Sequence, residues 1–274
     1  NAIIQINKID KEIPTIRLSQ NGTTEAVKEA NIEVAATDNL SGIKSIKYLW
    51  SIESEDVGEN DITNVLEEGS AIKTPKATGQ YYLWVLVKDN AGNNNKLRSN
   101  IFILDNIAPE IKISQNGTTE TIKSTNTKVT AADNLSGVSS TKYLWSTKSE
   151  NVEENEITNV LEEGQTITTP KVTGEYYLWV LVEDKVGNKA IVRSNAFILD
   201  NTAPTLEIEN IPETYTNGNV TVNIKANEQI QEIEGWTLSV DKQILTKEYN
   251  DNTEETITVM DLVGNETNAN IRIN

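Results

Sequence analysis

Part of the chain repeats at a fixed offset of 95 residues, and this repeat limits the fold more than any other feature. Asn21–Glu25 (Asn-Gly-Thr-Thr-Glu) returns at 116–120, and Asp38–Gly42 (Asp-Asn-Leu-Ser-Gly) returns at 133–137, without a gap. Identity over roughly six in ten aligned positions indicates a tandem duplication. A third, shorter copy begins at Phe197. We therefore expect similar modules in tandem.

Each copy contains short runs of β-branched and aromatic residues separated by turn sequences. In the second copy, Asn-Gly or Asn-Leu-Ser-Gly turns bound several of these runs, which is typical of β-strands. About seven strands in ~95 residues, with a turn every ~8–12 residues, predict a β-sandwich. The runs are Glu110–Ser114, Lys128–Ala132, Lys142–Ser146, Tyr176–Val182 and Ala190–Leu199.

A local pattern narrows the sandwich to the immunoglobulin type. Gly174-Glu-Tyr176-Tyr-Leu178 resembles the tyrosine corner of strand F, with Leu178 where antibody domains have a cysteine. Trp145, and Trp50 in the first copy, then fit the core tryptophan of strand C. Any other antiparallel sandwich stays open as the alternative.

Three further motifs resemble the bacterial immunoglobulin-like repeats in surface proteins of Gram-positive bacteria. They are the Asp-Asn-x-Ala-Pro start at 105–109 and 200–204, the Asp-Asn-Leu-Ser-Gly loop, and Val-x-Asp-x-x-Gly-Asn at 182–188. The resemblance covers nearly the whole chain. It implies an extracellular or wall-anchored stalk that spaces or presents another domain, in some members with an adhesive role, and it does not imply an enzyme.

We accordingly expect an all-β chain of three tandem immunoglobulin-like β-sandwiches, the first two with a short helical insertion after strand C. The expected boundaries are a linker from a preceding unit at 1–10, with Asn1-Ala2 as a cloning remnant, then repeats at 11–104, 105–199 and 200–274. The linkers are short, so we expect a semi-rigid rod.

Composition excludes several classes of function. The chain has no Cys and no His, which removes disulfides, thiolate or Ser-His-Asp catalysis, and His or Cys zinc sites. Its net charge of −17 opposes binding to nucleic acid or to an anionic membrane surface. No run approaches the ~20 apolar residues of a membrane span. Catalysis would rest on carboxylates alone, and nothing places a pair of them in a cleft, so we expect no enzymatic activity.

The outward face of the predicted strand F is also apolar. If alternate residues of Tyr81–Val87 point inward, then Tyr82, Trp84 and Leu86 point outward and form a patch too large for free exposure. The third copy lacks both this stripe and the segment after strand C, which favours cover by that segment. In it, Ile62, Val65 and Leu66 have helical spacing, which predicts a short helix across the sheet over 61–69. The alternative is an exposed platform for a glycan or protein.

Acidic residues recur at positions that immunoglobulin topology brings to one end of each sandwich: the start of strand A, the B–C loop and the F–G loop. Oxygen ligands without nitrogen or sulfur suit a hard cation such as Ca²⁺, which we predict at the junctions. The alternative is that Asp and Asn only cap turns. The candidate ligands are Asp10, Asp38, Asp89, Asp105, Asn106, Asp133, Asn134, Asp184, Asp200 and Asp261, with Glu228 as a further candidate in the third repeat.

The expected function is therefore a non-catalytic extracellular stalk, attached to the cell surface or cell wall, whose partners are the neighbouring domains of its own polypeptide. No cofactor is required apart from this Ca²⁺, and we expect a monomer. The alternative is an adhesive module that recognises a host glycan or protein through the C–F sheet face or the acidic insertion, where 52–72 holds seven acids and no Lys or Arg.

Overall fold

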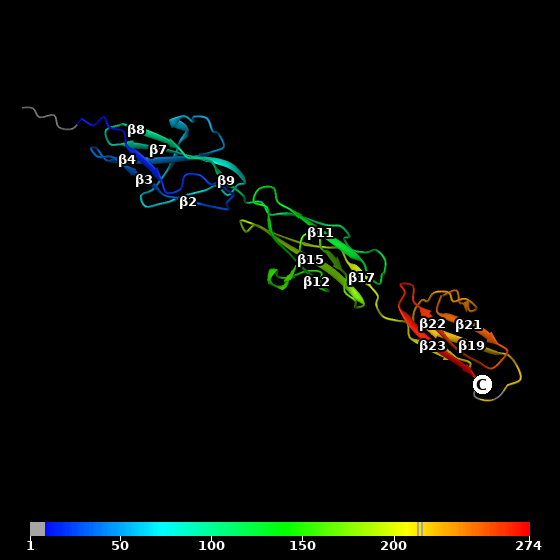
Figure 1. Ribbon diagram of the computed structural model, residues 1–274. Helices are drawn as coiled ribbons and strands as arrows, with labels where there is room; N and C mark the ends of the chain where they lie inside the picture. Colours follow the sequence, from blue (N-terminus) through cyan, green and yellow to red (C-terminus); the bar gives the residue numbers. More distant parts are fainter. Residues whose placement is uncertain (1–8, 213, 215) are drawn as a thin grey trace, which may run out of the picture. The chain divides into compact units, whose positions relative to one another are not determined.

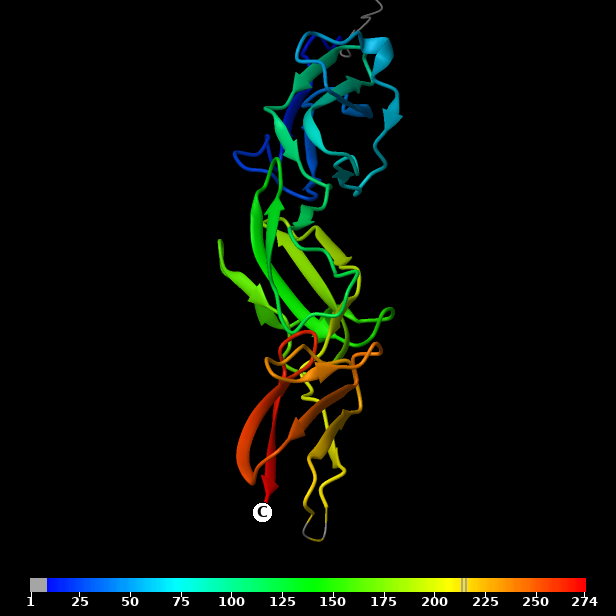
Figure 2. The same cartoon turned by 90° about the vertical axis from the view of Figure 1, so that its right-hand side faces the viewer.

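The computed structural model describes residues 9–212, 214 and 216–274 (Figures 1 and 2). Strands make up nearly all of its regular structure, with two single turns of 3-10 helix, which confirms the predicted all-β fold. Among the described residues, no helix has the length and apolar character needed to cross a bilayer. Most of the predicted linker 1–10 lies outside the described residues.

The first repeat contains two layers of antiparallel strands around one core. In one layer β1 (Thr15–Leu18) pairs with β3 (Val34–Thr37), and β2 (Asn31–Ile32) pairs with β6 (Ile72–Lys73). The other layer has the order β5 (Asn64–Val65), β4 (Ile43–Ser51), β7 (Gly79–Asp89) and β8 (Asn94–Arg98), and β9 (Phe102–Leu104) also pairs with β7.

The second and third repeats are built from similar strands. In the second, β10 (Glu110–Ile113), β11 (Asn126–Ala132) and β14 (Thr166–Thr168) form one sheet. The other sheet consists of β13 (Asn159–Val160), β12 (Val138–Ser146), β15 (Gly174–Asp184), β16 (Lys189–Arg193) and β17 (Phe197–Leu199). In the third, the sheets are β18 (Leu206–Glu209), β19 (Val220–Ala226), β21 (Ile244–Tyr249) and β20 (Thr237–Leu238), and the pair β22 (Thr253–Met260) and β23 (Glu266–Ile273).

The core of the first repeat follows the alternation of β7. Leu83, Val85 and Val87 are fully buried, together with Phe102 of β9. Trp50 packs edge-on against Phe102, with ring centroids 5.1 Å apart. Large apolar side chains on alternate positions thus fill the space between the sheets, at about 1.5–3 kcal/mol of burial free energy each.

The tyrosine-corner prediction is only half right. Leu178 is fully buried, as expected for the strand F position. Among the described residues, however, the hydroxyl of Tyr176 has no hydrogen-bond partner. Its ring instead lies over Gly174, where an added Cβ would be 3.4 Å from the Tyr176 ring. Packing therefore holds this tyrosine, and the residues that the structure describes provide no corner hydrogen bond.

The described residues group into two compact units whose limits do not follow the sequence repeats. The first unit runs to Glu110 and also includes 131–141 and 182–190, and the second contains 111–130, 142–181 and 191–274. The loops that follow strands B and F of the second repeat therefore belong with the end of the first repeat. The repeat boundaries at 104/105 and 199/200 stay predictions.

The insertion after β4 covers the apolar stripe, but the helix predicted over 61–69 is wrong. The segment contains one 3-10 turn, η1 (Glu59–Asp61), and then strand β5, whose residue Val65 is exposed. The edge of β4 explains the difference, because Leu66 N donates to Ile46 O at 2.9 Å and satisfies backbone groups that a helix would have paired internally. The second repeat has the same order, with η2 (Glu154–Glu156) before β13.

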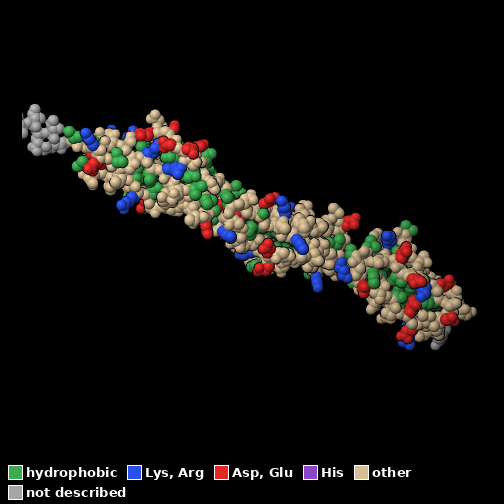
Figure 3. Space-filling model, turned by 45° about the horizontal axis from the view of Figure 1, so that its top comes forward, with side chains coloured by type: hydrophobic (Ala, Val, Ile, Leu, Met, Phe, Trp, Pro, Cys, Tyr) green, Lys and Arg blue, Asp and Glu red, His purple; other side chains and the backbone are tan. Residues whose placement is uncertain are grey.

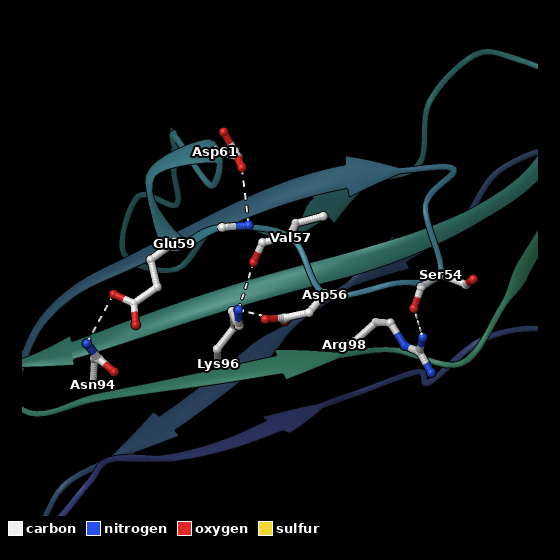
Figure 4. A network of polar contacts seen from close by, with 9 residues as sticks. Ser54, Asp56, Val57, Glu59, Asp61, Asn94, Lys96 and Arg98 are labelled. Carbon is white, nitrogen blue, oxygen red and sulfur yellow. Dashed lines mark hydrogen bonds and ion pairs between the residues drawn. The ribbon is translucent and has the colours of Figure 1, made fainter.

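The predicted cover of the stripe is confirmed in the first repeat. Ile62 of the insertion, Trp84 and Leu86 form one cluster, and none is more than 5% exposed. Polar contacts hold the segment in place, since Lys96 Nζ contacts both Asp56 and the Val57 carbonyl at 2.7 Å (Figure 4). The outward aromatic face is therefore an internal packing surface and not an exposed platform.

Gly22 lies in a turn that only glycine fits, which gives a prediction for the fold. Its φ is +88°, and an added Cβ would lie 2.6 Å from Ile101 O. Gly69 has a similar φ of +74° but open space around it. We expect Gly69→Ala to cost about 1–2 kcal/mol from backbone strain alone. Gly22→Ala should cost a further ~1–3 kcal/mol from overpacking against a backbone atom. Urea denaturation of both variants measures this difference, and equal losses would contradict the turn geometry.

Candidate metal centres

Three acidic clusters lie where the sequence predicts them. In each cluster one carboxylate precedes the first strand of a repeat, one lies in the loop after strand B, and one ends strand F. The ligand-type oxygens within each cluster lie within 4.8 Å of one another. The clusters are Asp10, Asp38 and Asp89; Asp105, Asp133 and Asp184; and Asp200, Glu228 and Asp261.

The aspartate at the end of strand F is buried in all three clusters. Asp184 is 2% exposed. Its Oδ1 accepts hydrogen bonds from Val186 N and Asn188 N, at 2.9 and 2.8 Å, and its Oδ2 accepts from Asn188 Nδ2 at 2.7 Å. Asp89 and Asp261 accept the same set from Asn93 and Asn265. The Asp-x-x-Gly-Asn motif thus builds a turn around its own carboxylate.

These hydrogen bonds favour the ionised form of Asp89 and Asp184. Burial alone would raise the pKa of Asp184, but hydrogen bonds from the backbone and side chain of Asn188 and from Val186 N outweigh it, so its pKa lies below the ordinary value. The pKa of Asp89 is lowered in the same way, with the Asn93 side chain as the main donor against the effect of burial. Both groups carry a full negative charge at neutral pH.

The linker aspartate joins two loops. Asp105 is 1% exposed, and its Oδ1 and Oδ2 accept from Ile107 N at 3.2 Å and Ser136 N at 3.1 Å. Asn188 Nδ2 also donates to the Asp105 carbonyl at 3.1 Å. One asparagine therefore contacts two members of the cluster.

The B–C loop aspartates have an oxygen left over. Asp133 Oδ1 accepts from Leu135 N and Gly137 N, at 3.2 and 2.7 Å. Among the described residues its Oδ2 has no hydrogen-bond donor. Asp38 repeats this arrangement in the first cluster. The turn-capping alternative is thus correct for one oxygen, and the other is free to bind a cation.

Glu228 replaces this aspartate in the third cluster. Its pKa is raised, first by burial and then by the negative charges of Asp200 and Asp261. A raised pKa means that the folded chain disfavours the charged form of Glu228. The shift therefore reports mainly the burial of Glu228, and in addition the like-charge repulsion from Asp200 and Asp261.

Within the described residues, none of the nine carboxylates of the clusters forms an ion pair with Lys or Arg. Carboxylate oxygens at this spacing are the ligand type that Ca²⁺ binds, at about 2.3–2.6 Å and with about 6–8 oxygens. The residues therefore fit a hard cation, with carbonyls or water completing the shell.

The two predicted asparagine ligands remain predictions. Asn106 Nδ2 donates to the carbonyls of Lys28 and Ala77, at 3.1 and 3.3 Å, so this amide group helps to close the linker turn. The side chain of Asn134 is exposed and has no partner among the described residues. Asx chemistry explains both, because Asn after Asp in a turn often bonds to backbone or to solvent.

Sequence reasoning overlooked two groups of residues at these centres. The asparagines that end each Asp-x-x-Gly-Asn motif hold the buried aspartates, and their constant spacing from those aspartates was the available signal. Lys28 Nζ donates to Gly187 O at 3.1 Å, and Lys123 Nζ, at the repeat offset, donates to Gly264 O at 2.6 Å. No sequence signal identified the lysine contacts.

No protein-family model and no curated protein matches the chain. Solved structures with a similar course include fibronectin(III)-like modules of Clostridium thermocellum CbhA, at 14% identity over 68% of this chain and 93% of that one, with a TM-score of 0.29. A 1.5-MDa bacterial ice-binding adhesin matches at 14% identity over 95% and 97%, with a TM-score of 0.36. The D00-D0 domain of intimin matches at 10% identity over 69% and 100%, with a TM-score of 0.30. Scores this low carry no information about ligand or activity.

Proposed function

We propose that the chain is a non-catalytic spacer segment of an extracellular bacterial surface protein, in which Ca²⁺ at the three clusters limits movement between consecutive repeats. The observation that carries this proposal is the make-up of the clusters. Asp105 and Asp200 belong to the linkers, while their cluster partners belong to the loops of the repeat that follows. A cation bound there would tie each linker to the next repeat.

Hydrogen bonds already support such a tie. The linker carbonyls of Asp105 and Asp200 each accept from a loop asparagine of the following repeat, Asn188 at 3.1 Å and Asn265 at 3.0 Å. Lys28 and Lys123 donate to the same pair of loops. A cation would add bonds to three carboxylates at each place, and neutralise the repulsion between them. The proposal of a cell-surface or wall-attached stalk that presents another domain draws on this tie and on the motif resemblance.

Ca²⁺ suits the clusters better than Mg²⁺. Mg²⁺ demands near-octahedral geometry at about 2.0–2.1 Å and retains much of its water, whereas Ca²⁺ accepts irregular sets of oxygens. The excess of acidic over basic residues, 41 against 24, fits an extracellular, cation-rich setting, and Figure 3 shows Asp and Glu side chains interspersed with Lys and Arg on the visible face. The net charge of −17 also opposes nucleic acid and anionic membranes as partners.

The alternative function, an adhesive module, has less support at the sites first considered for it. Burial of Trp84 and Leu86 counts against the C–F sheet face of the first repeat as an aromatic platform for a glycan or protein. The acidic insertion keeps exposed carboxylates, including Glu53 and Glu55, but Lys96 and Arg98 bind the same segment to the sheet. The spacer is therefore the function that these contacts favour.

Spin-label distance measurements test the spacer directly. The chain has no cysteine, so Lys73→Cys with Lys171→Cys gives two labels at exposed positions, one in each of the first two repeats. We expect Ca²⁺ to narrow the distribution of label distances, and Asp133→Asn to prevent the narrowing. A distribution that stays equally broad at saturating Ca²⁺ would contradict the stiffening role, even if melting experiments showed that the ion binds.

A further inference from the structure

We propose that the first repeat binds an extended basic peptide, which would add as a strand to the open edge of β3. This goes beyond the spacer function and does not rest on Ca²⁺. A groove of about 830 Å³ lies between β3, the start of β4 and the end of the insertion. Its lining includes Val34, Ala36, Ile46 and Leu66.

In the third repeat the strand equivalent to β3 has a partner strand on both sides. There β19 pairs with β18 on one side and with β21 along six residues on the other, where Leu245 faces Ile224. The pair Leu206 and Ala226 in that repeat corresponds to Ile16 and Ala36 in the first.

In the first repeat the second partner is missing. Strand β3 pairs with β1 alone, and the two-residue strand β6 reaches only β2. In the register of β6 the residues opposite 34–36 would be 68–70, but the end of the insertion forms a turn there, in which Ser70 N donates to Glu67 O at 3.1 Å. The groove therefore occupies the place that β21 fills in the third repeat.

Backbone groups of β3 point into this gap. Ser19 N donates to Glu33 O at 2.9 Å, so Glu33 faces β1. Because successive residues of an antiparallel strand face opposite sides, the N–H and C=O groups of Val34 and Ala36 face away from β1. No other described strand pairs with them. Such an edge is a template for an added strand.

The side chains at the gap are apolar and incompletely covered. Val34, Ala36, Ile46 and Leu66 pack against the core but remain partly exposed. In the third repeat Ile224 and Leu245 are fully buried. An added strand with apolar residues at alternate positions would complete the core of the first repeat as β21 does in the third.

The charged residues that line the groove indicate which kind of peptide would bind there. Glu33, Glu67 and Glu68 line the groove and are exposed, against a single exposed Lys44. A second copy of the chain is a poor fit, because its net charge is −17. The rim fits a partner segment with Lys or Arg between its apolar residues.

Two synthetic peptides test the proposal. The basic peptide has the sequence of residues 242–249 with Glu248→Lys, and the acidic control has Lys242→Glu and Lys247→Glu with the same apolar positions. We expect saturable binding of the basic peptide in fluorescence anisotropy, at least about tenfold tighter than that of the acidic one. Ala36→Pro removes an N–H that β1 does not use, so binding should be lost while the repeat stays folded.

A second variant covers the case in which Ala36→Pro fails to fold. Glu67→Lys with Glu68→Lys alters only exposed side chains. This double variant should weaken the binding of the basic peptide and strengthen the binding of the acidic peptide. No saturable binding up to about 1 mM would overturn the proposal. So would binding that neither variant changes, which would place the peptide elsewhere. Sedimentation that shows dimers, lost in Ala36→Pro, would identify a second copy as the occupant and would also overturn it.

Discussion

Addition of Ca²⁺ to the metal-free chain should raise its melting temperature. A ligand that binds only the folded state stabilises it by about 2.7 kcal/mol at 100 times its Kd. For a unit of about 100 residues, 1 kcal/mol corresponds to about 4–8 °C. We therefore expect a rise of more than about 10 °C at saturating Ca²⁺, measured by calorimetry against a chelator. The rise follows from three carboxylates within 4.8 Å that no Lys or Arg neutralises among the described residues.

Asparagine variants separate metal binding from turn formation. Asp38→Asn and Asp133→Asn keep the side-chain oxygen that accepts the loop N–H groups and remove the charge of the other oxygen. Each variant should lose the rise in melting temperature that Ca²⁺ gives through its own cluster. In the presence of a chelator, its melting temperature should stay close to that of the parent chain. Asp251→Asn makes the same chemical change at an exposed site outside the clusters and should keep the full gain. Melting curves that do not respond to millimolar Ca²⁺ would leave turn capping as the only role of these acids.

The Ca²⁺ gain should decline in acid, and in a definite order. Glu228 has a raised pKa, so it takes up a proton at higher pH than an ordinary glutamate, and the third cluster should lose its gain first. Asp89 and Asp184 have lowered pKa values, so their contribution to stability is full above the unfolded-state pKa. That contribution disappears only as the pH falls through the lower folded-state values. Titration of the melting temperature with and without Ca²⁺ distinguishes the two stages.

The repeat made both the fold and the acidic clusters predictable. The conformation of a turn depends on neighbouring residues, so the motif Asp-x-x-Gly-Asn predicts a turn around its aspartate whatever the rest of the sequence is. Topology then brings the loops to one end of the sandwich, which is why Asp105, Asp133 and Asp184 could be grouped although they lie far apart in sequence. The hydrogen-bond donors to these aspartates were harder to predict. Asn188 and Asn106 have the same amide group, and only the packing of the folded chain determines which of them donates to a cluster aspartate.

The insertion could not be predicted in the same way. Ile62, Val65 and Leu66 have helical spacing, yet Ile62 is buried against Trp84 while Val65 is exposed on a strand. The edge of β4 decides the structure of the segment, because it lies far away in sequence but pairs with the segment as a neighbouring strand. The open edge of β3 could not be predicted from the sequence either, because it depends on where the insertion runs in the folded chain.

Replacement of Trp84 by alanine should cost about 3–5 kcal/mol of unfolding free energy, the usual range for a buried tryptophan. Trp84 is 5% exposed, packs with Ile62 and Leu86, and has the Lys96 ammonium 5.6 Å from its ring centroid. Its loss would leave a cavity beneath the insertion. Thr256 is its counterpart in the third repeat, where insertion and stripe are both absent, and Thr256→Ala should cost under about 1 kcal/mol.

Phenylalanine variants test the packing more finely, because the two equivalent tryptophans differ in one hydrogen bond. Trp179 Nε1 donates to Lys148 O at 3.1 Å, whereas the buried Nε1 of Trp84 has no partner in the described part of the chain. Trp179→Phe should therefore lose about 1 kcal/mol of hydrogen bonding that Trp84→Phe does not lose. Urea denaturation of all four variants measures these differences. A Trp84→Ala chain as stable as the parent would mean that the insertion does not seal the sheet, and the exposed aromatic face would again be a binding surface.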